Sequence, residues 1–318
     1  MHFYSAYGMT IRSYLEVPEL TPCTEHLQAD CEIRFGSVSG PMPAAGQPRL
    51  IAFAPDGAYF AWPHIARVGV TRSGRITLDP LTSDDKIVRF ALLGPVMAAI
   101  LHLRGVHLLH GSAVACGRRA ILLIGHKQAG KSTMAAAFAA RGCSILNDDV
   151  LPIAGSTLSA GYPGLKLAPS IAQTLLPDWP TIGASSSDAD KIVVTDTARV
   201  SGDLPIGSVI ILDPHASTDV TVLSPSGALP DLLQHGYALK FGPAALTGGR
   251  GAALFESCTR LAQQTHVIRV RRPDGVPQLR ALVDQLLDSV PDSIVHSSNR
   301  ALGAAQIAGT NIPSTRSH

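Results

Sequence analysis

The sequence predicts a mixed α/β fold, in which a β-rich segment over residues 1–85 precedes a larger α/β domain over residues 86–292. Three observations predict it. Short apolar runs separated by turn residues fill the first segment, as in β-rich domains. An apolar run of strand length then leads into a glycine-rich loop and an alanine-rich stretch of helical length. Helices predicted over 252–264 and 278–290 flank a strand predicted over 266–270, the alternation of an α/β domain.

The first 85 residues contain runs typical of strands at 49–54 and 65–70. Turn signals separate the runs, namely Gly40-Pro41-Met42-Pro43, Pro55-Asp56-Gly57 and Ser73-Gly74-Arg75. No catalytic constellation accompanies them, so we expect a structural or substrate-presenting role for this segment. Residues 84–103 form one predicted helix that leads into the second domain.

Composition excludes several classes of protein. Hydrophobic residues make up 46% of the 318 residues and charged residues 16%, which is ample for a large core. The net charge of +2 comes without a basic stripe, so we expect no nucleic-acid partner. The apolar segment 90–103 is shorter than the roughly 20 residues of a membrane span, which predicts a buried helix and no membrane partner.

Cellular location is predicted from the N-terminus and the cysteines. Residues 1–5 lack a basic region followed by an apolar core, so we expect no signal peptide. The five cysteines form no C-x-x-C pair, which predicts reduced thiols in a cytoplasmic protein. They are Cys23, Cys31, Cys116, Cys143 and Cys258. The mean hydropathy of +0.20 favours a homo-oligomer.

Residues 125–132 match the pattern G-x-x-x-x-G-K-[ST] of a phosphate-binding loop, or P-loop. The apolar run 120–124 precedes the loop, and a helix is predicted over 131–140 with Gly142 as its stop. Strand, glycine loop and helix together direct backbone N–H groups and the positive end of a helix at a phosphate. A chance match at a glycine turn is the alternative, and this context argues against it. The sequence therefore predicts a nucleoside triphosphate site, formed by Gly125, His126, Lys127, Gln128, Ala129, Gly130, Lys131, Ser132 and Thr133.

Two adjacent carboxylates, Asp148 and Asp149, lie 16 and 17 residues after Ser132. A helix of about ten residues runs roughly 15 Å away from the phosphates. The strand predicted over 144–146 must then return to the same edge of the sheet, where ligands of such sheets bind. One carboxylate can hold Mg²⁺ together with the Ser132 hydroxyl, and the other can accept a proton from an attacking hydroxyl. A solvated acidic turn or a helix cap is the alternative, and the sequence leaves open which aspartate has which role.

His110 lies in an apolar strand predicted over 106–115. A histidine in such a strand is more often a core residue than a catalyst. The turn at 116–119 should pair this strand with the strand before the P-loop. His110 would then lie close enough to contact a phosphate oxygen or to orient the acidic pair.

The remaining chain is less informative. A region interrupted by proline and glycine runs from 152 to 180, and strands are predicted near 191–195 and 208–212. The polar, aperiodic stretch 293–318 is predicted to be a disordered tail. Cations that could recognise a carboxylate or phosphate are Lys191, Arg250, Arg269 and Arg271, and plain surface charge is the alternative for each.

Residues 100–155 resemble the catalytic domain of HPr kinase/phosphorylase, a bacterial serine kinase that has a P-loop. The resemblance rests on Leu109-His110-Gly111, Gly125 to Ser132, Arg141-Gly142 and Leu146-Asn147-Asp148-Asp149. It implies a P-loop domain of that type that uses ATP and Mg²⁺. It also implies that Lys131 and Ser132 serve the phosphates, with Ser132 and Asp148 on the metal. Asp149 would be the general base and His110 an assisting catalytic residue.

Two departures from that family narrow the expected activity and substrate of this protein. The bifunctional family has an acidic residue where this chain has Thr133, and its later glutamate-bearing signature has no match in residues 161–167. By the resemblance, that glutamate belongs to the metal and phosphorylase side of the chemistry, so we expect neither phosphorylase activity nor HPr as the substrate. The chain resembles more closely the divergent HPr-kinase-like proteins of ribosomal peptide pathways, some of which phosphorylate the C-terminal serine of a lasso precursor peptide.

Three functions therefore stay open on the sequence. The first is an ATP- and Mg²⁺-dependent serine kinase of a peptide or small protein. The second is a kinase of a small metabolite, which needs the same phosphate machinery. The third is a nucleotide-binding regulatory protein without transfer activity. His110 together with the acidic pair favours chemistry, because a regulator does not need a placed base. The acceptor, the oligomeric state and the preference between ATP and GTP are not predicted.

Overall fold

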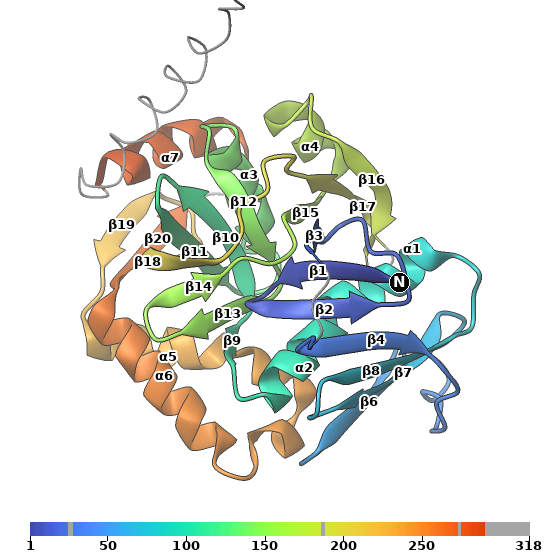
Figure 1. Ribbon diagram of the computed structural model, residues 1–318. Helices are drawn as coiled ribbons and strands as arrows, with labels where there is room; N and C mark the ends of the chain where they lie inside the picture. The colour runs from blue at the N-terminus through green and yellow to red at the C-terminus, as the bar shows by residue number, and fades with distance from the viewer. Residues whose placement is uncertain (25–27, 186–187, 273–274, 290–318) are drawn as a thin grey trace, which may run out of the picture.

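The computed structural model describes residues 1–24, 28–185, 188–272 and 275–289 of the chain. It shows a mixed α/β protein, and the described part contains three sheets (Figure 1). The tail predicted over residues 293–318 lies outside the described residues.

The β-rich first segment forms an eight-stranded sheet with the order β3-β1-β2-β4-β8-β7-β6-β5. Its second half, β5 to β8, is an antiparallel meander. The strands are β1 (His2–Ala6), β2 (Met9–Ser13), β3 (Thr21–Pro22), β4 (Cys31–Phe35), β5 (Leu50–Ala54), β6 (Gly57–Trp62), β7 (Ala66–Thr71) and β8 (Arg75–Pro80). The predicted strands at 49–54 and 65–70 are confirmed as β5 and β7.

A helical segment, Asp85–Leu103, connects this sheet to the rest of the chain. It consists of α1 (Asp85–Ala91), a π-helical turn η1 (Leu92–Val96) and α2 (Met97–Leu103). Pro95 lies inside η1, and because proline has no N–H it cannot continue the α-helical hydrogen bonding. By length and composition the segment could cross a membrane, but 72% of its most apolar window is buried inside the structure. Its apolar side chains share a core with the first sheet, and the predicted domain boundary at residue 85 stays a prediction.

The nine-stranded second sheet carries the predicted P-loop. Its order is β12-β10-β11-β18-β14-β13-β9, and β20 pairs with both β18 and β19. The strands are β9 (His107–Leu109), β10 (Gly111–Cys116), β11 (Arg119–Gly125), β12 (Ser144–Asp148), β13 (Leu151–Ala154), β14 (Thr157–Ser159), β18 (Asp203–Pro214), β19 (Asp219–Val222) and β20 (His266–Arg272). β10 pairs antiparallel with both β11 and β12, so β12 runs in the same direction as β11. This direction was predicted, and it brings the ends of β11 and β12 to one edge.

The chain also forms a third sheet and further helices (Figure 1). The third sheet, β15-β17-β16, consists of β15 (Gly164–Leu167), β16 (Thr181–Ser185) and β17 (Asp188–Thr195). The helices are α3 (Lys131–Ala139), α4 (Pro169–Leu175), α5 (Pro225–Gln234), η2 (Tyr237–Phe241), η3 (Pro243–Leu246), α6 (Arg250–Gln264) and α7 (Pro277–Ser289). α3, α4 and α7 bury their apolar side chains against one face of the second sheet. α5 and α6 cover the opposite face.

The cysteine prediction was wrong for two of the five residues. Cys116 ends β10 and Cys143 immediately precedes β12, and the neighbouring residues Ala115 and Ser144 are paired across the two strands. The Cα atoms of the two cysteines are therefore only 4.6 Å apart, and their sulfurs form a disulfide. Their 27-residue separation gave no such signal in the sequence. The other three cysteines are free thiols.

Candidate active site

The predicted strand, glycine loop and helix are present at the centre of the second sheet. β11 ends at Gly125, and α3 begins at Lys131. Gly130 has a left-handed φ of 85°, which glycine adopts without the strain that a Cβ would cause. The first backbone N–H groups of a helix have no partner within the helix, so the first turn of α3 faces the loop with free donors. Lys131, Ser132 and Thr133 form this turn.

The side chain of Lys131 lies over the loop that precedes it. Its Nζ donates to the carbonyl oxygens of Gly125 at 2.8 Å and of His126 at 2.9 Å. Burial lowers the pKa of Lys131, and the charges of the two aspartates oppose that shift. The side chain of Lys127, four residues earlier in the same loop, is exposed. Of the two loop lysines, Lys131 is therefore the one held at the site.

Asp148 ends β12 and contacts α3. Its Oδ1 accepts hydrogen bonds from Ser112 Oγ at 2.6 Å and from Ser132 Oγ at 3.1 Å. Its Oδ2 accepts from the backbone N–H of Lys166 at 3.2 Å. Burial raises the pKa of Asp148 to about 6, the charge of Asp149 adds to the shift, and the Ser112 hydrogen bond opposes it. The structure therefore brings Asp148 to the Ser132 hydroxyl, as predicted for a shared metal site.

Asp149 directly follows the last residue of β12. Its backbone has a positive φ of 71°, a conformation in which aspartate is enriched and which turns the chain sharply after β12. Its Oδ2 forms an ion pair with Lys166 Nζ at 2.5 Å. Burial would raise the pKa of Asp149, but the charge of Lys166 and its hydrogen bond to the carboxylate outweigh the effect of burial and hold that pKa below its ordinary value. The two neighbouring carboxyl groups thus differ in pKa: Asp149 stays ionised, whereas Asp148 binds a proton more readily.

His110 occupies the break between β9 and β10. Its backbone N–H donates to the carbonyl of His235, and its ring Nδ1 lies 3.1 Å from the carbonyl oxygen of Asp149. Nδ1 also lies 2.9 Å from Lys240 Nζ. A protonated Lys240 donates to Nδ1 only when the ring proton is on Nε2, so the two contacts of Nδ1 are alternatives. Burial lowers the pKa of His110 to about 4, with the charge of Lys240 adding to the shift, so the ring is neutral at neutral pH.

Two lysines at the acidic pair were not predicted. Lys166, on β15, contacts both aspartates, and Lys240, on η2, contacts His110. Lys166 lies in the segment 161–167, whose only sequence signal was the lack of the family's glutamate. Lys240 had no signal, since it lies 91 residues after Asp149 in an unremarkable stretch. Burial lowers the pKa of Lys240 to about 8, and the charge of Asp149 opposes this.

The cations proposed from sequence for substrate recognition lie mostly elsewhere. Arg269 and Arg271 form ion pairs with Asp231 and Asp213. Arg250 donates to the carbonyl oxygen of Pro55 at 2.9 Å. Lys191 is near enough to the loop for its charge to lower the pKa of Lys131. Of the four, only Lys191 is placed to act at the site.

The oxygen donors of Ser132 and Asp148 fit Mg²⁺. This ion prefers hard oxygen ligands and is usually held by one or two carboxylates together with substrate phosphates rather than by a full protein cage. No cluster of three or more His, Cys, Asp or Glu side chains suited to a metal occurs in the part of the chain that the structure describes. A metal at this site would therefore share its coordination between the protein and the nucleotide.

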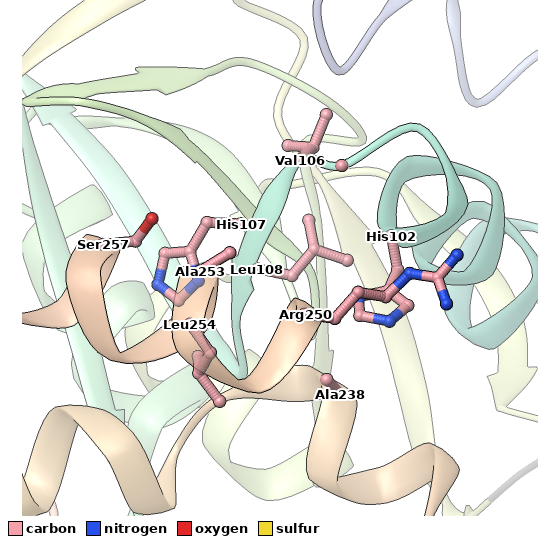
Figure 2. A pocket seen from close by; sticks show the side chains of 10 residues that line it. His102, Val106, His107, Leu108, Ala238, Arg250, Ala253, Leu254 and Ser257 are labelled. Atoms are coloured by element: carbon pink, nitrogen blue, oxygen red, sulfur yellow. The ribbon is translucent and has the colours of Figure 1, made fainter. Parts of the chain in front are cut away.

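A cavity of about 60 Å³ lies away from this site, between β9 and α6 (Figure 2). Its lining is mainly apolar, with His102, His107, Arg250 and Ser257 as the polar side chains. Burial lowers the pKa of His107 to about 4, and its Nε2 lies 3.8 Å from Cys258 Sγ. None of the predicted catalytic residues lines this cavity.

Comparison with known proteins gives a distant structural similarity. No family model matches the chain, and no curated protein matches it. Among solved structures, the chain is similar to the Hpr(Ser) kinase/phosphatase from Coxiella burnetii, with 12% sequence identity and a TM-score of 0.29. The match covers 57% of this chain and 88% of that chain. The function proposed below rests on the geometry of the site.

Proposed function

We propose that this protein is an ATP- and Mg²⁺-dependent kinase that transfers the γ-phosphoryl group to a serine hydroxyl. One observation carries the proposal. Ser132, in the first turn of the helix after the loop, donates a 3.1 Å hydrogen bond to Asp148, and this bond joins the loop helix to the acidic pair. A protein that only binds a nucleotide does not need a second carboxylate beside this contact. Here Asp149 lies next to it. Its carboxylate pairs with Lys166, and its backbone carbonyl oxygen contacts Nδ1 of His110.

The proposed roles follow from the contacts. Lys131 and the first turn of α3 would hold the phosphates, and Ser132 and Asp148 would hold Mg²⁺, which would supply positive charge to offset that of the phosphates. Asp149 accepts the proton of the attacking hydroxyl. Proton affinity alone would favour Asp148 as the base, but Asp148 accepts a hydrogen bond from Ser132, and this contact favours Asp148 as the metal ligand and Asp149 as the base. Phosphoryl transfer through a loose transition state depends mainly on positioning and electrostatics, so a strong base is not required.

Lys166 and Lys240 are two further residues of the proposed active site, in addition to those predicted from the sequence. Both lie beside the acidic pair, where they can neutralise the negative charge that gathers when a triphosphate and two carboxylates meet. His110 is neutral and keeps its Nδ1 between the Asp149 carbonyl and Lys240. We assign His110 an assisting role, which is to hold one or the other of these two groups, according to which ring nitrogen carries the proton.

We further propose, from the family resemblance, that the acceptor is a serine at or near the C-terminus of a precursor peptide. A flexible peptide needs only a groove beside the γ-phosphate, because an extended chain can bring its hydroxyl into line with the leaving oxygen. The test is incubation of the protein with ATP, Mg²⁺ and a peptide ending in serine, compared with the same peptide ending in alanine, with mass spectrometry as the readout. Phosphate on the serine peptide alone supports the proposal. Phosphate only on HPr or on a free metabolite would overturn the peptide acceptor and keep the kinase.

A further inference from the structure

A narrow cavity opens directly beside the acidic pair. Its volume is about 10 Å³, close to the minimum that holds one water molecule. The lining residues are Phe90, Leu93, Gly94, Asp148, Asp149, Tyr162, Gly164 and Lys166. The first three belong to the helical segment Asp85–Leu103, so the segment that packs with the N-terminal sheet forms one wall. The cavity is thus small, mostly apolar on that wall and acidic at one end.

The hydroxyl of Tyr162 is the unexplained polar group of this cavity. Tyr162 is only 6% exposed, and its Oη has no hydrogen-bond partner among the residues that the structure describes. Buried hydroxyls are nearly always hydrogen-bonded, since leaving one unpaired costs free energy. An unpaired buried hydroxyl beside two carboxylates indicates that its partner is a ligand.

Gly164 leaves the space that the hydroxyl of Tyr162 occupies. A Cβ on Gly164 would lie 2.4 Å from Tyr162 Oη, so a side chain at position 164 would displace the phenol ring. Tyr7 provides a contrast, because it is a second buried tyrosine near the acidic pair but its hydroxyl donates to the carbonyl oxygen of Leu93 at 3.4 Å. The free hydroxyl of Tyr162 is therefore not a general property of tyrosines in this core.

The opposite wall leaves room for a group to enter. Gly94 lies in the π-helical turn η1, and a Cβ built on it meets no atom within 4 Å. π-Helical turns inside α-helices occur frequently at functional sites. Here the turn presents a residue without a side chain to the cavity, which keeps the space in front of the aspartates open.

We propose that this cavity is the acceptor subsite of the kinase proposed above, and that Tyr162 Oη donates a hydrogen bond to the oxygen of an acceptor hydroxymethyl group. In the transfer step this oxygen forms a bond to the γ-phosphorus of ATP, the bond from that phosphorus to the β–γ bridging oxygen breaks, and ADP leaves. The proton of the acceptor hydroxyl passes to Asp149. A cavity of this size has room for little more than the acceptor hydroxyl, so the unbranched side chain of serine should bring its hydroxyl in more easily than the branched side chain of threonine.

The test uses Tyr162→Phe, which removes only the hydroxyl, and Gly94→Ala, which adds a methyl group to the open wall. Tyr7→Phe is the matched control, since its hydroxyl already has a partner. The probes are N-acetyl-L-serine amide and N-acetyl-L-threonine amide, titrated calorimetrically into full-length protein saturated with Mg²⁺ and a non-hydrolysable ATP analogue. The affinity of the ATP analogue and the melting temperature are measured for each variant.

We expect wild type to bind the serine amide more tightly than the threonine amide. Tyr162→Phe and Gly94→Ala should each weaken serine-amide binding by about tenfold or more. Both should leave nucleotide affinity and melting temperature unchanged or improved, and Tyr7→Phe should keep wild-type affinity for the probe. Equal binding of the serine amide by wild type and Tyr162→Phe, including no binding by either, overturns this inference. Failure of wild type to bind the nucleotide analogue would instead overturn the proposed kinase function on which it rests.

Discussion

Ser112 is the residue through which the metal role of Asp148 can be tested most cleanly. Its side chain is fully buried, and its Oγ donates the shortest of the described hydrogen bonds to Asp148, at 2.6 Å. A hydrogen bond to a charged group contributes about 1.5–3 kcal/mol, and each 1.4 kcal/mol corresponds to roughly a factor of ten. Loss of a group that orients a metal ligand typically costs 10–100-fold in metal affinity. We therefore expect Ser112→Ala to raise the Mg²⁺ concentration for half-maximal ATP turnover by about 10–100-fold.

The same variant should shift the pH profile in a defined direction. The Ser112 hydrogen bond favours ionised Asp148 and so lowers its pKa, which burial raises to about 6. Removing the bond raises this pKa further. Because the proposed metal ligand is the ionised carboxylate, activity at limiting Mg²⁺ should fall at a higher pH in Ser112→Ala than in wild type as the solution is acidified. The measurement is ATP turnover between pH 5 and pH 8 at fixed, limiting Mg²⁺.

Ser208→Ala provides the matched control. Ser208 is another buried serine of the same sheet, on β18, and its Oγ has no hydrogen-bond partner among the described residues. We expect this variant to keep the wild-type Mg²⁺ dependence and pH profile. If Ser112→Ala and Ser208→Ala give the same Mg²⁺ dependence, Asp148 does not act as a metal ligand through this network.

Three further predictions follow from the contacts. Asp149→Asn should keep nucleotide affinity and slow phosphoryl transfer by roughly 10²-fold or more, as measured by single-turnover kinetics. Asp148→Asn should instead raise the Mg²⁺ concentration that transfer requires. Wild-type rates in both variants would contradict the proposed roles of the two aspartates. His110→Ala should slow transfer less than Asp149→Asn in the same assay, and an unfolded variant by circular dichroism would favour a core role for this histidine. Replacing Cys116 and Cys143 together by serine removes a cross-link of 27 residues and should lower the free energy of unfolding by about 3.5 kcal/mol in urea titrations, with no loss expected when the free Cys23 is changed instead.

Much of the second sheet and of the helix after the loop could be predicted from local pattern. The strand before the loop, the helix from Lys131 and the strand ending at Asp148 have strong local signals, namely an uninterrupted apolar run, a glycine at each helix end and a change of periodicity. The contact between Ser132 and Asp148 also followed from the sequence. A helix of known rise and a returning strand leave few places where the carboxylates can lie.

The parts that were missed depend on contacts between distant segments. Lys240 contacts His110, which lies 130 residues earlier in the chain. Tyr162 is recognised as a candidate site residue only because it lines a cavity together with Phe90 and Leu93 of a distant helical segment. The disulfide likewise depends on strand register, which pairs Ala115 with Ser144. Local propensity and spacing carry no information on such pairings, because packing of whole elements decides them.

The central claim is that the loop before α3 binds a nucleoside triphosphate through Lys131. The most direct test is a titration of Mg²⁺ and a fluorescent ATP analogue into wild type, Lys131→Ala and Lys127→Ala. Lys131 donates to the loop carbonyls and lies near both aspartates, whereas Lys127 is an exposed lysine of the same loop, so total charge is matched between the variants. We expect saturable binding by wild type and Lys127→Ala, and a loss of affinity of at least about tenfold in Lys131→Ala, as for removal of a charged contact to phosphate. Equal binding by all three proteins, or no binding by wild type, would contradict the account.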